Sequence, residues 1–298
     1  MGKSLVDHAS PITLTTLRWG IAAVCLLPIV WWKEKKLLPP KKAILPLVLM
    51  GVTGVVLFNL LQFLALEHTS ATNVGLISTL NMISIAVCSA IFLKEKMNML
   101  QILAMSISFF GVLLVLSKGK LDYLLSLNFN AGDLWMLAAV SIWGINTVCS
   151  KWAMAHASAL MSTLYSAIFG LIMLLPISIP QFSVSNLDAP FIGGILFTGV
   201  LATVICMLFW NICVHNLGST TSGMFLNFNP IFTALIAFLL LGEKLSWIQG
   251  IGSVIVIAGC YLFSYFAKKK ASISIGVVIS KYFHIRANKP PHPHKKGS

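Results

Sequence analysis

The sequence predicts an all-α, polytopic membrane helix bundle built from two inverted-topology repeats. Of its 298 residues, 57% are hydrophobic and only 10% are charged, too few charges for the surface of a water-soluble protein of this length. The apolar residues form uninterrupted blocks of about 20 residues, the length at which an α-helix crosses a bilayer. A transmembrane barrel would instead alternate apolar and polar residues along shorter strands.

Nine apolar segments follow one another along the chain, separated mostly by short connections rich in Pro, Lys, Gly and Ser. Each segment must be helical, because unpaired backbone groups are too costly in lipid. The expected spans are residues 11–32, 43–66, 71–93, 97–117, 134–150, 157–180, 190–214, 219–241 and 245–267.

The charged loops predict the orientation of these spans. Lysines gather on one side, in the loop 33–42, at Lys94, Lys96 and Lys151, and in the tail from Lys268. Positively charged loops stay in the cytoplasm, so we expect a cytoplasmic C-terminus and an external N-terminus in a bacterial inner (cell) membrane. The net charge of +13 reflects these loops and the tail, and no nucleic-acid partner is expected.

An internal repeat aligns residues 3–111 with residues 151–259 without a gap, an offset of 148 positions. The second copy begins with the span 134–150, whose counterpart is missing from the first. The expected organisation is a first repeat at 3–117 lacking its first helix, a five-helix repeat at 132–266, and a basic, disordered cytoplasmic tail at 268–298. A five-span unit inverts its successor across the membrane, as in secondary transporters that work by alternating access.

Three stretches of the chain resemble one transporter family. Residues 8–28, HASPITLTTLRWGIAAVCLLP, resemble the end of the first helix and the second helix of the EamA branch of the drug/metabolite transporter superfamily. Residues 141–153, SIWGINTVCSKWA, resemble its first-helix "WG" signature in the second copy. Residues 226–262, LNFNPIFTALIAFLLLGEKLSWIQGIGSVIVIAGCYL, resemble its ninth and tenth helices.

The resemblance covers about residues 3–266, and the missing first-copy "WG" helix is its main departure. First-copy residues also differ in places, with Met82 aligned to Pro230 and Lys94 to Gly242. The resemblance implies a ten-helix transporter, commonly an exporter of amino acids and related metabolites, with a central cavity between its halves.

Polar and aromatic residues within the spans are the candidates for a substrate cavity, because polar groups facing lipid are costly. Asn59 and Gln62, for example, are three residues apart and share a helix face. The expected cavity residues are Asn59, Gln62, Asn81, Trp143, Asn146, Trp210, Asn211, Asn227 and Asn229. The alternative is that these amides only tie helices together.

Gating or structural roles are expected for four residues: Arg18, Glu95, Pro230 and Glu243. Arg18 lies well inside a span and could attract a carboxylate substrate, although snorkelling to the external surface or bonding to helix-end carbonyls is the alternative. Glu95 and Glu243 lie at helix ends as caps or gating contacts. Pro230 removes a backbone donor and frees carbonyls in the preceding turn.

Glycines in the spans indicate close helix packing. Gly51 and Gly54 could mark a rocking contact, with static packing as the alternative. Gly250, Gly252 and Gly259 are typical of packing within the chain or of contacts in a homodimer.

The sequence contains no pattern that favours an enzyme, a metal site or a cofactor. Its six cysteines are unpaired in spacing, and it has no HExxH motif, paired aspartates or nucleophile near a mid-span His. We therefore expect a secondary transporter with a small-molecule substrate, an exporter of small polar metabolites such as amino acids. The alternative is a truncated, non-transporting membrane protein with a structural or sensory role.

Overall fold

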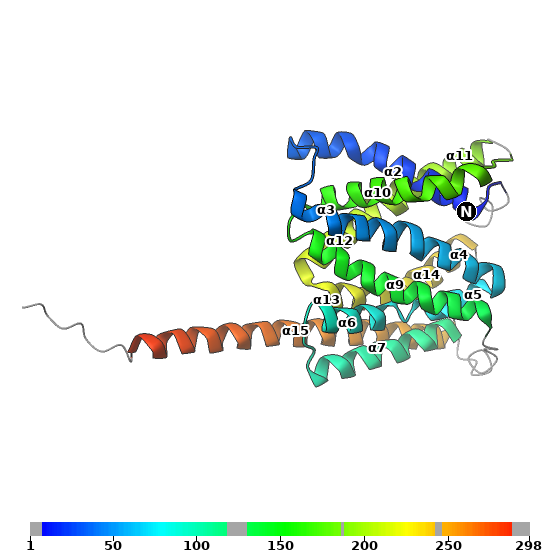
Figure 1. Cartoon of the computed structure of the whole chain (residues 1–298). Coiled ribbons are helices and arrows are strands. Elements are labelled where there is room, and N and C mark those ends of the chain that lie inside the picture. The colour runs from blue at the N-terminus through cyan, green and yellow to red at the C-terminus, as the bar shows by residue number, and fades with distance from the viewer. Residues whose placement is uncertain (1–7, 118–129, 186–187, 242–245, 288–298) are drawn as a thin grey trace, which may run out of the picture.

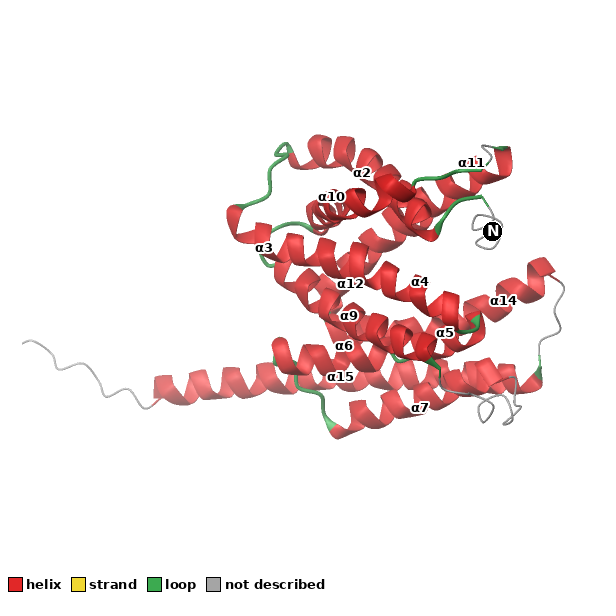
Figure 2. Cartoon of the chain, turned by 45° about the vertical axis from the view of Figure 1, so that its right-hand side comes forward, coloured by secondary structure: helices red, strands yellow, loops and turns green. Residues whose placement is uncertain are grey.

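A computed structural model describes residues 8–117, 130–185, 188–241 and 246–287 of the chain. These residues form a helical bundle (Figures 1 and 2). Within them, nine segments are long and apolar enough to cross a membrane, in the order that the sequence predicts. The predicted all-α membrane fold is therefore confirmed.

The first repeat contributes four of these spans. The first is α2 (Pro11–Glu34), which begins where the Ser10 hydroxyl accepts a hydrogen bond from the Thr13 amide. The other three are α3 (Lys41–Met50) with the π-helix η1 (Gly51–Leu57) and α4 (Phe58–His68), then α5 (Ala71–Ser78) with α6 (Asn81–Phe92), and finally α7 (Met99–Ser117).

The second repeat contributes five spans, beginning with α9 (Ala131–Ala153). A capping box between Asn130 and Asp133 starts this helix. The others are α10 (Ala159–Ser178) with the 3₁₀ turn η2 (Ile179–Gln181), then α11 (Ala189–Leu196) with the π-helix η3 (Phe197–Ile205) and α12 (Cys206–Leu217), then α13 (Ser219–Met224) with the 3₁₀ turn η4 (Phe225–Phe228) and α14 (Asn229–Leu241), and finally α15 (Trp247–Ala287).

The two repeats depart from regular α-helix at equivalent places. The π-helical segments η1 and η3 contain Gly51 and Gly199, which the repeat aligns. The third span is interrupted just before Asn81, and the eighth is interrupted just before its aligned residue, Asn229. Shared irregularities of this kind show that the two copies have the same local structure, and broken helices are common at transporter sites.

Helices α7 and α15 pack closely against each other, and aligned residues of the two repeats make equivalent contacts. A Cβ atom on Gly111 would lie 2.8 Å from the Val256 nitrogen, and one on the aligned Gly259 would lie 2.7 Å from the nitrogen of Ser108, the residue aligned with Val256. Gly252 also faces the backbone of α7, whereas a Cβ on Gly250 would meet nothing within 4 Å. Gly252 and Gly259 thus serve packing within the chain.

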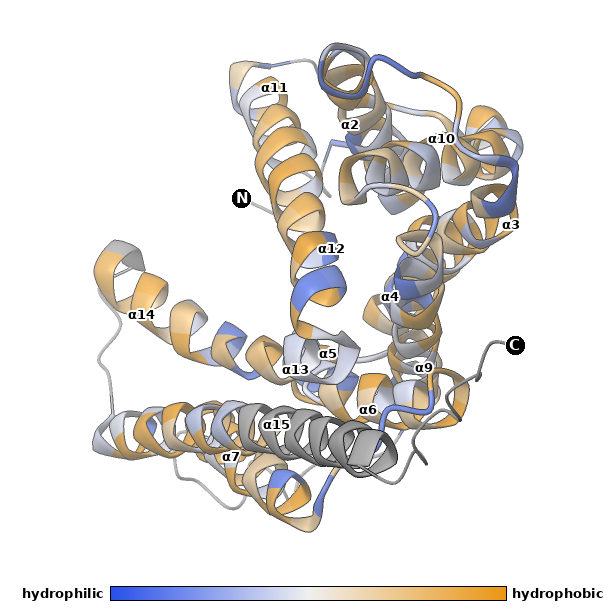
Figure 3. Cartoon of the chain, turned by 90° about the vertical axis from the view of Figure 1, so that its left-hand side faces the viewer, coloured by the Kyte–Doolittle hydropathy of each residue, from blue (hydrophilic) through white to orange (hydrophobic). Residues whose placement is uncertain are grey.

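One end of the bundle, here called the basic face, carries the loops 35–40 and 93–98 and the point where α15 leaves the spans (Figure 1). The other end is called the opposite face. Apolar residues cover much of the helices seen along the bundle in Figure 3.

The predicted disordered tail at 268–298 differs in the structure. Helix α15 continues through Ala287, and residues 288–298 lie outside the described residues. An existing helix extends at little cost because each added residue gains a backbone hydrogen bond without a new nucleation step. No proline interrupts the chain between Trp247 and Ala287.

Candidate functional site

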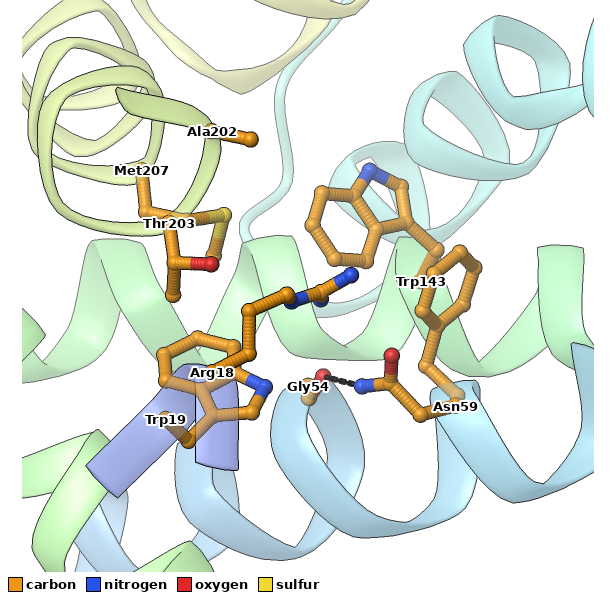
Figure 4. A pocket seen from close by; sticks show the side chains of 9 residues that line it. Arg18, Trp19, Gly54, Asn59, Trp143, Ala202, Thr203 and Met207 are labelled. Atoms are coloured by element: carbon orange, nitrogen blue, oxygen red, sulfur yellow. Dashed lines mark hydrogen bonds between the residues drawn. The ribbon is translucent and has the colours of Figure 1, made fainter. Parts of the chain in front are cut away.

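A small cavity of about 110 Å³ lies where α2, η1, α4, α9, η3 and α12 meet. Figure 4 shows this cavity, here called the arginine cavity, with the Arg18 guanidinium entering it between Trp143 and Asn59. Its lining residues are Arg18, Trp19, Gly54, Phe58, Asn59, Trp143, Ala202, Thr203 and Met207.

The π-helical turn shapes one wall of the arginine cavity. The Asn59 side-chain amide donates to the carbonyl oxygens of Gly54 at 3.1 Å and Val55 at 2.8 Å. These carbonyls belong to η1, whose wide turns alter the ordinary α-helical bonding pattern. Asn59 thereby uses its donors on its own helix, and its side-chain oxygen faces the cavity in Figure 4.

Arg18 has no hydrogen-bond or carboxylate partner among the described residues, and its Nε atom is buried without a partner. The sequence left snorkelling to the external surface as the alternative for this residue. In the structure its side chain instead extends from α2 into the bundle, toward Trp143 on α9 (Figure 4). The repeat aligns Arg18 with Ser166, so this charge is present in one copy only.

An aromatic cluster borders the arginine cavity. The rings of Phe58 and Trp143 have centroids 4.8 Å apart, and Trp143 and Trp210 are 5.9 Å apart. Phe58 lines both the arginine cavity and a larger one, so its ring stands at their boundary. Trp210 lines neither of these two cavities, and its indole nitrogen is buried without a partner.

The larger cavity has a volume of about 650 Å³, within the range of roughly 300–1,000 Å³ typical of small-molecule sites. It lies toward the opposite face, beside the end of α7 and the start of α15, and is here called the amide cavity. Its lining residues are Phe58, Gln62, Gly75, Ser78, Thr79, Asn81, Val115, Leu116, Leu226, Asn229, Pro230, Thr233, Ala234, Ala237 and Gln249.

Four polar side chains of the amide cavity, Gln62, Asn81, Asn229 and Thr233, have no hydrogen-bond partner within the described part of the chain. The Asn81 side-chain oxygen is also buried. Gln62 and Asn81 are partly buried, where an unpaired polar group is costly, while Asn229 and Thr233 are exposed, so all four side chains are available to water or to a ligand. Asn81 and Asn229 are aligned by the repeat, and each begins the second half of a broken span.

Three of the predicted cavity amides lie instead in helix packing. Asn211 accepts from Ser150 at 2.7 Å and donates to Thr163 at 2.9 Å. Asn227 donates to Ser108 at 2.8 Å and to the Met82 sulfur. These bonds hold both amides in contacts between helices, and neither lines the arginine cavity or the amide cavity.

Asn146 is the third of these amides. Its side-chain oxygen accepts from Thr53 at 3.1 Å, and a Cβ on Gly54 would come within 2.7 Å of that oxygen. Gly54 therefore permits a close approach of η1 to α9, which is the static-packing alternative for this glycine. Gly51 packs similarly on the backbone of α10 near Gly170.

Glu95 joins the two repeats at the basic face. Its carboxylate accepts from the backbone amides of Ser219 and Thr220, each at 3.3 Å, and from the Thr220 hydroxyl at 2.7 Å. The carboxylate thus caps the start of α13, where helix amides lack partners of their own. Pro230 lines the amide cavity, while Glu243 lies outside the described residues.

Sequence reasoning did not single out several lining residues. Thr233 follows Asn229 by four positions and so shares its helix face, a signal that could have found it. Phe58 directly precedes Asn59, and Gln249 aligns with Gln101, but nothing in the sequence placed either beside a cavity. Thr203 and Met207 reach the arginine cavity only through the tertiary packing of η3 and α12.

A model of the EamA-like transporter family matches residues 1–117 and 130–265. The chain belongs to this EamA-like transporter family. The protein is therefore a multi-pass membrane transporter of the drug/metabolite transporter type with a small-molecule substrate, rather than an enzyme.

Relatives match this EamA-like transporter over most of their length. The uncharacterized transporter YyaM of Bacillus subtilis is 31% identical over 264 residues, covering 87% of this chain and 86% of that protein. An uncharacterized transporter of Archaeoglobus fulgidus is 28% identical, covering 86% and 89% of the two chains. The S-adenosylmethionine/S-adenosylhomocysteine transporter of Chlamydia trachomatis is 24% identical, covering 82% and 77%.

A solved crystal structure shares the fold, with a TM-score of 0.75 and 17% identity over 90% of this chain and 91% of the other. At this level of identity the similarity concerns the fold alone.

Proposed function

We propose that this EamA-like transporter exports a small polar metabolite of the amino-acid class by alternating access between its two repeats. The observation that carries the proposal is the amide cavity, about 650 Å³ in volume, into which the repeat-related Asn81 and Asn229 and the unpaired Gln62 project. Repeat-related broken helices at a polar cavity suit a transporter whose halves rock about a common site. Export is the direction that the family resemblance implies.

The Glu95 contact supports the alternating-access part of the proposal. It ties the loop after α6 in the first repeat to the start of α13 in the second, at the basic face. The amide cavity lies toward the opposite face. This arrangement fits a state that is closed at the basic face, and transport would require the Glu95 contact to break and re-form.

The amino-acid class is supported by a relative's substrate chemistry. S-adenosylmethionine and S-adenosylhomocysteine, which name the Chlamydia relative, each carry an α-amino acid group. Amide and hydroxyl side chains suit the ammonium and carboxylate of such a group because they donate and accept hydrogen bonds. We further propose a bacterial inner membrane with the basic face and the C-terminus in the cytoplasm, as the lysine distribution predicts.

A toxicity and efflux screen tests the proposal. Cells expressing the full chain should resist inhibitory amino acids or their analogues, and labelled substrate should leave preloaded cells faster than from vector controls. Replacing Gln62, Asn81 or Asn229 by Ala should reduce efflux at equal membrane abundance. Ser141→Ala, on an exposed face of α9, is the matched control and should leave efflux unchanged.

Two results would overturn this function. Efflux equal to the vector control across amino acids, nucleosides and amphipathic drugs would favour the non-transporting alternative. Accumulation of substrate in expressing cells would reverse the proposed direction.

A further inference from the structure

Arg18 carries a partly buried charge, for which the described residues supply no counter-ion. Its guanidinium enters the arginine cavity, and its Nε atom is buried without a partner (Figure 4). Removing a cation even partly from water without a partner is unfavourable. An ionisable residue inside a membrane bundle is by default a functional candidate.

The neighbouring polar side chains do not complete Arg18. The Asn59 amide nitrogen is committed to backbone carbonyls, and the Thr203 hydroxyl donates to the carbonyl of Thr198 at 2.9 Å. The Asn59 oxygen faces the cavity but is neutral. The protein therefore offers the guanidinium a polar neighbour without a compensating negative charge.

The described carboxylates are placed elsewhere. Asp133 accepts from Thr69 and caps α9, and Glu95 binds the start of α13. Asp188 caps α11 and lies near His8, while Glu34 contacts Ser158 and Glu67 is exposed near the end of α4. None of these five groups lines the arginine cavity.

The sizes of the two cavities indicate how a ligand would be divided between them. About 110 Å³ is below the range of whole-metabolite sites but accommodates a compact anionic group, whereas the amide cavity has room for the body of a metabolite. Phe58 lines both, so the two spaces meet at this residue.

We propose that Arg18 binds the carboxylate of the transported metabolite, with the body of that metabolite in the amide cavity. This inference rests on the proposed transport function and names the group by which the substrate is recognised. A guanidinium matches a carboxylate with two parallel hydrogen bonds, which a lysine ammonium does not reproduce. Because Ser166 replaces the arginine in the second repeat, the site fixes one orientation of the substrate.

Binding to the purified full chain tests the inference independently of transport. The midpoint of thermal unfolding is measured with each common L-amino acid and S-adenosylmethionine, and with the matched compounds whose α-carboxylate is replaced by a carboxamide. At least one carboxylate should raise the midpoint while its carboxamide does not. Arg18→Gln should weaken that binding at least tenfold, and Arg18→Lys should weaken it less. Ser141→Ala should match the wild type.

Three binding results would overturn the inference: equal stabilisation by carboxylate and carboxamide, stabilisation by no carboxylate on the panel, or unchanged carboxylate affinity in Arg18→Gln. Stabilisation by inorganic phosphate alone would also overturn it, since the site would then recognise a phosphate. If Arg18→Gln fails to fold, Arg18→Lys decides, because an equal affinity in that variant contradicts two-point recognition.

The same compounds in the efflux assay separate this inference from the proposed function. Export confined to compounds without a carboxylate would end the inference and leave the transporter intact. Carboxylate binding that depends on Arg18, without any export, would end the proposed function and leave the inference standing.

Discussion

The two broken spans of the repeats, α5–α6 in the first and α13–η4–α14 in the second, have equivalent sequence positions but different packing. In the third span 33% of the apolar 18-residue stretch is buried, against 22% in the corresponding stretch of the eighth. Helix α6 buries Met82, Ile85, Ala86 and Ser89 and packs against α9, whereas no described residue of α14 is buried. Figures 2 and 3 show α14 diverging from α11 and α12.

The ends of these spans differ in the same way. At the opposite face, Asn73 in α5 donates to Asp133 of α9 at 3.3 Å. Helix α14 packs chiefly on η4 and α7, and the eighth span is anchored at its other end, where Glu95 binds Ser219 and Thr220. One repeat packs both halves of its broken helix against neighbouring helices, whereas the other packs chiefly its basic-face half. We therefore expect α14 to be the moving wall of the amide cavity.

Cross-linking α14 should have the largest effect. Cysteines replacing Thr233 on α14 and Val115 on α7 line the same cavity, and a bifunctional thiol reagent would join them in a background without the six native cysteines. Efflux should fall to near the vector level, because the wall could no longer move, and reductive cleavage should restore it. Single-cysteine variants treated with the reagent are the control, and full efflux by the cross-linked protein would show that α14 is static.

Truncating a packed side chain should separate the two spans by stability. Ile85 is fully buried in the first repeat, so Ile85→Ala should lower the free energy of unfolding by about 2 kcal/mol or more through lost packing. Leu235 on α14 is 44% exposed, and Leu235→Ala should cost under about 1 kcal/mol because few contacts are lost. Unfolding in mixed detergent measures both. Equal costs would remove the asymmetry between the spans.

Neutralising Glu95 should loosen the anchored end of the eighth span. Hydrogen bonds to a charged group contribute about 1.5–3 kcal/mol, and this partly exposed carboxylate should contribute about 1 kcal/mol, roughly a fivefold change in the balance between states. Weakening the contact should shift the population away from the state that is closed at the basic face, and so make the amide cavity less accessible from the opposite face. In Glu95→Gln, a cysteine at position 237, which lines that cavity, should therefore react more slowly with an impermeant maleimide from the opposite face. Glu67→Gln is the matched control, and an unchanged rate in Glu95→Gln would show that the contact does not hold the observed state.

Removing a packing amide should have the smallest effect. Asn227→Ala loses the bond to Ser108, and such bonds within membrane proteins average about 0.6 kcal/mol. The unfolding free energy should fall by roughly this amount, while substrate affinity, measured by thermal stabilisation, should stay the same. A large loss of affinity with intact stability would place Asn227 in the site after all.

Several features were determined by the sequence itself because they depend on local composition and period. The number and order of the spans follow from apolar block length, and the gap-free repeat predicted that Asn81 and Asn229 occupy equivalent places. The EamA-like resemblance in residues 8–28, 141–153 and 226–262 predicted the family. Each of these signals is contained within a short segment or in the comparison of two segments.

Tertiary structure alone decided which polar side chains have hydrogen-bond partners and which line a cavity. Asn227 and Asn229 are two positions apart, yet the first finds a partner in Ser108, 119 residues away, and the second faces a cavity. Likewise, a lone arginine in a span is compatible with snorkelling or with an internal site, and only the surrounding helices set its direction. The physical reason is that hydrogen-bond partners and counter-ions come from distant parts of the chain, so burial and satisfaction are properties of the packed bundle.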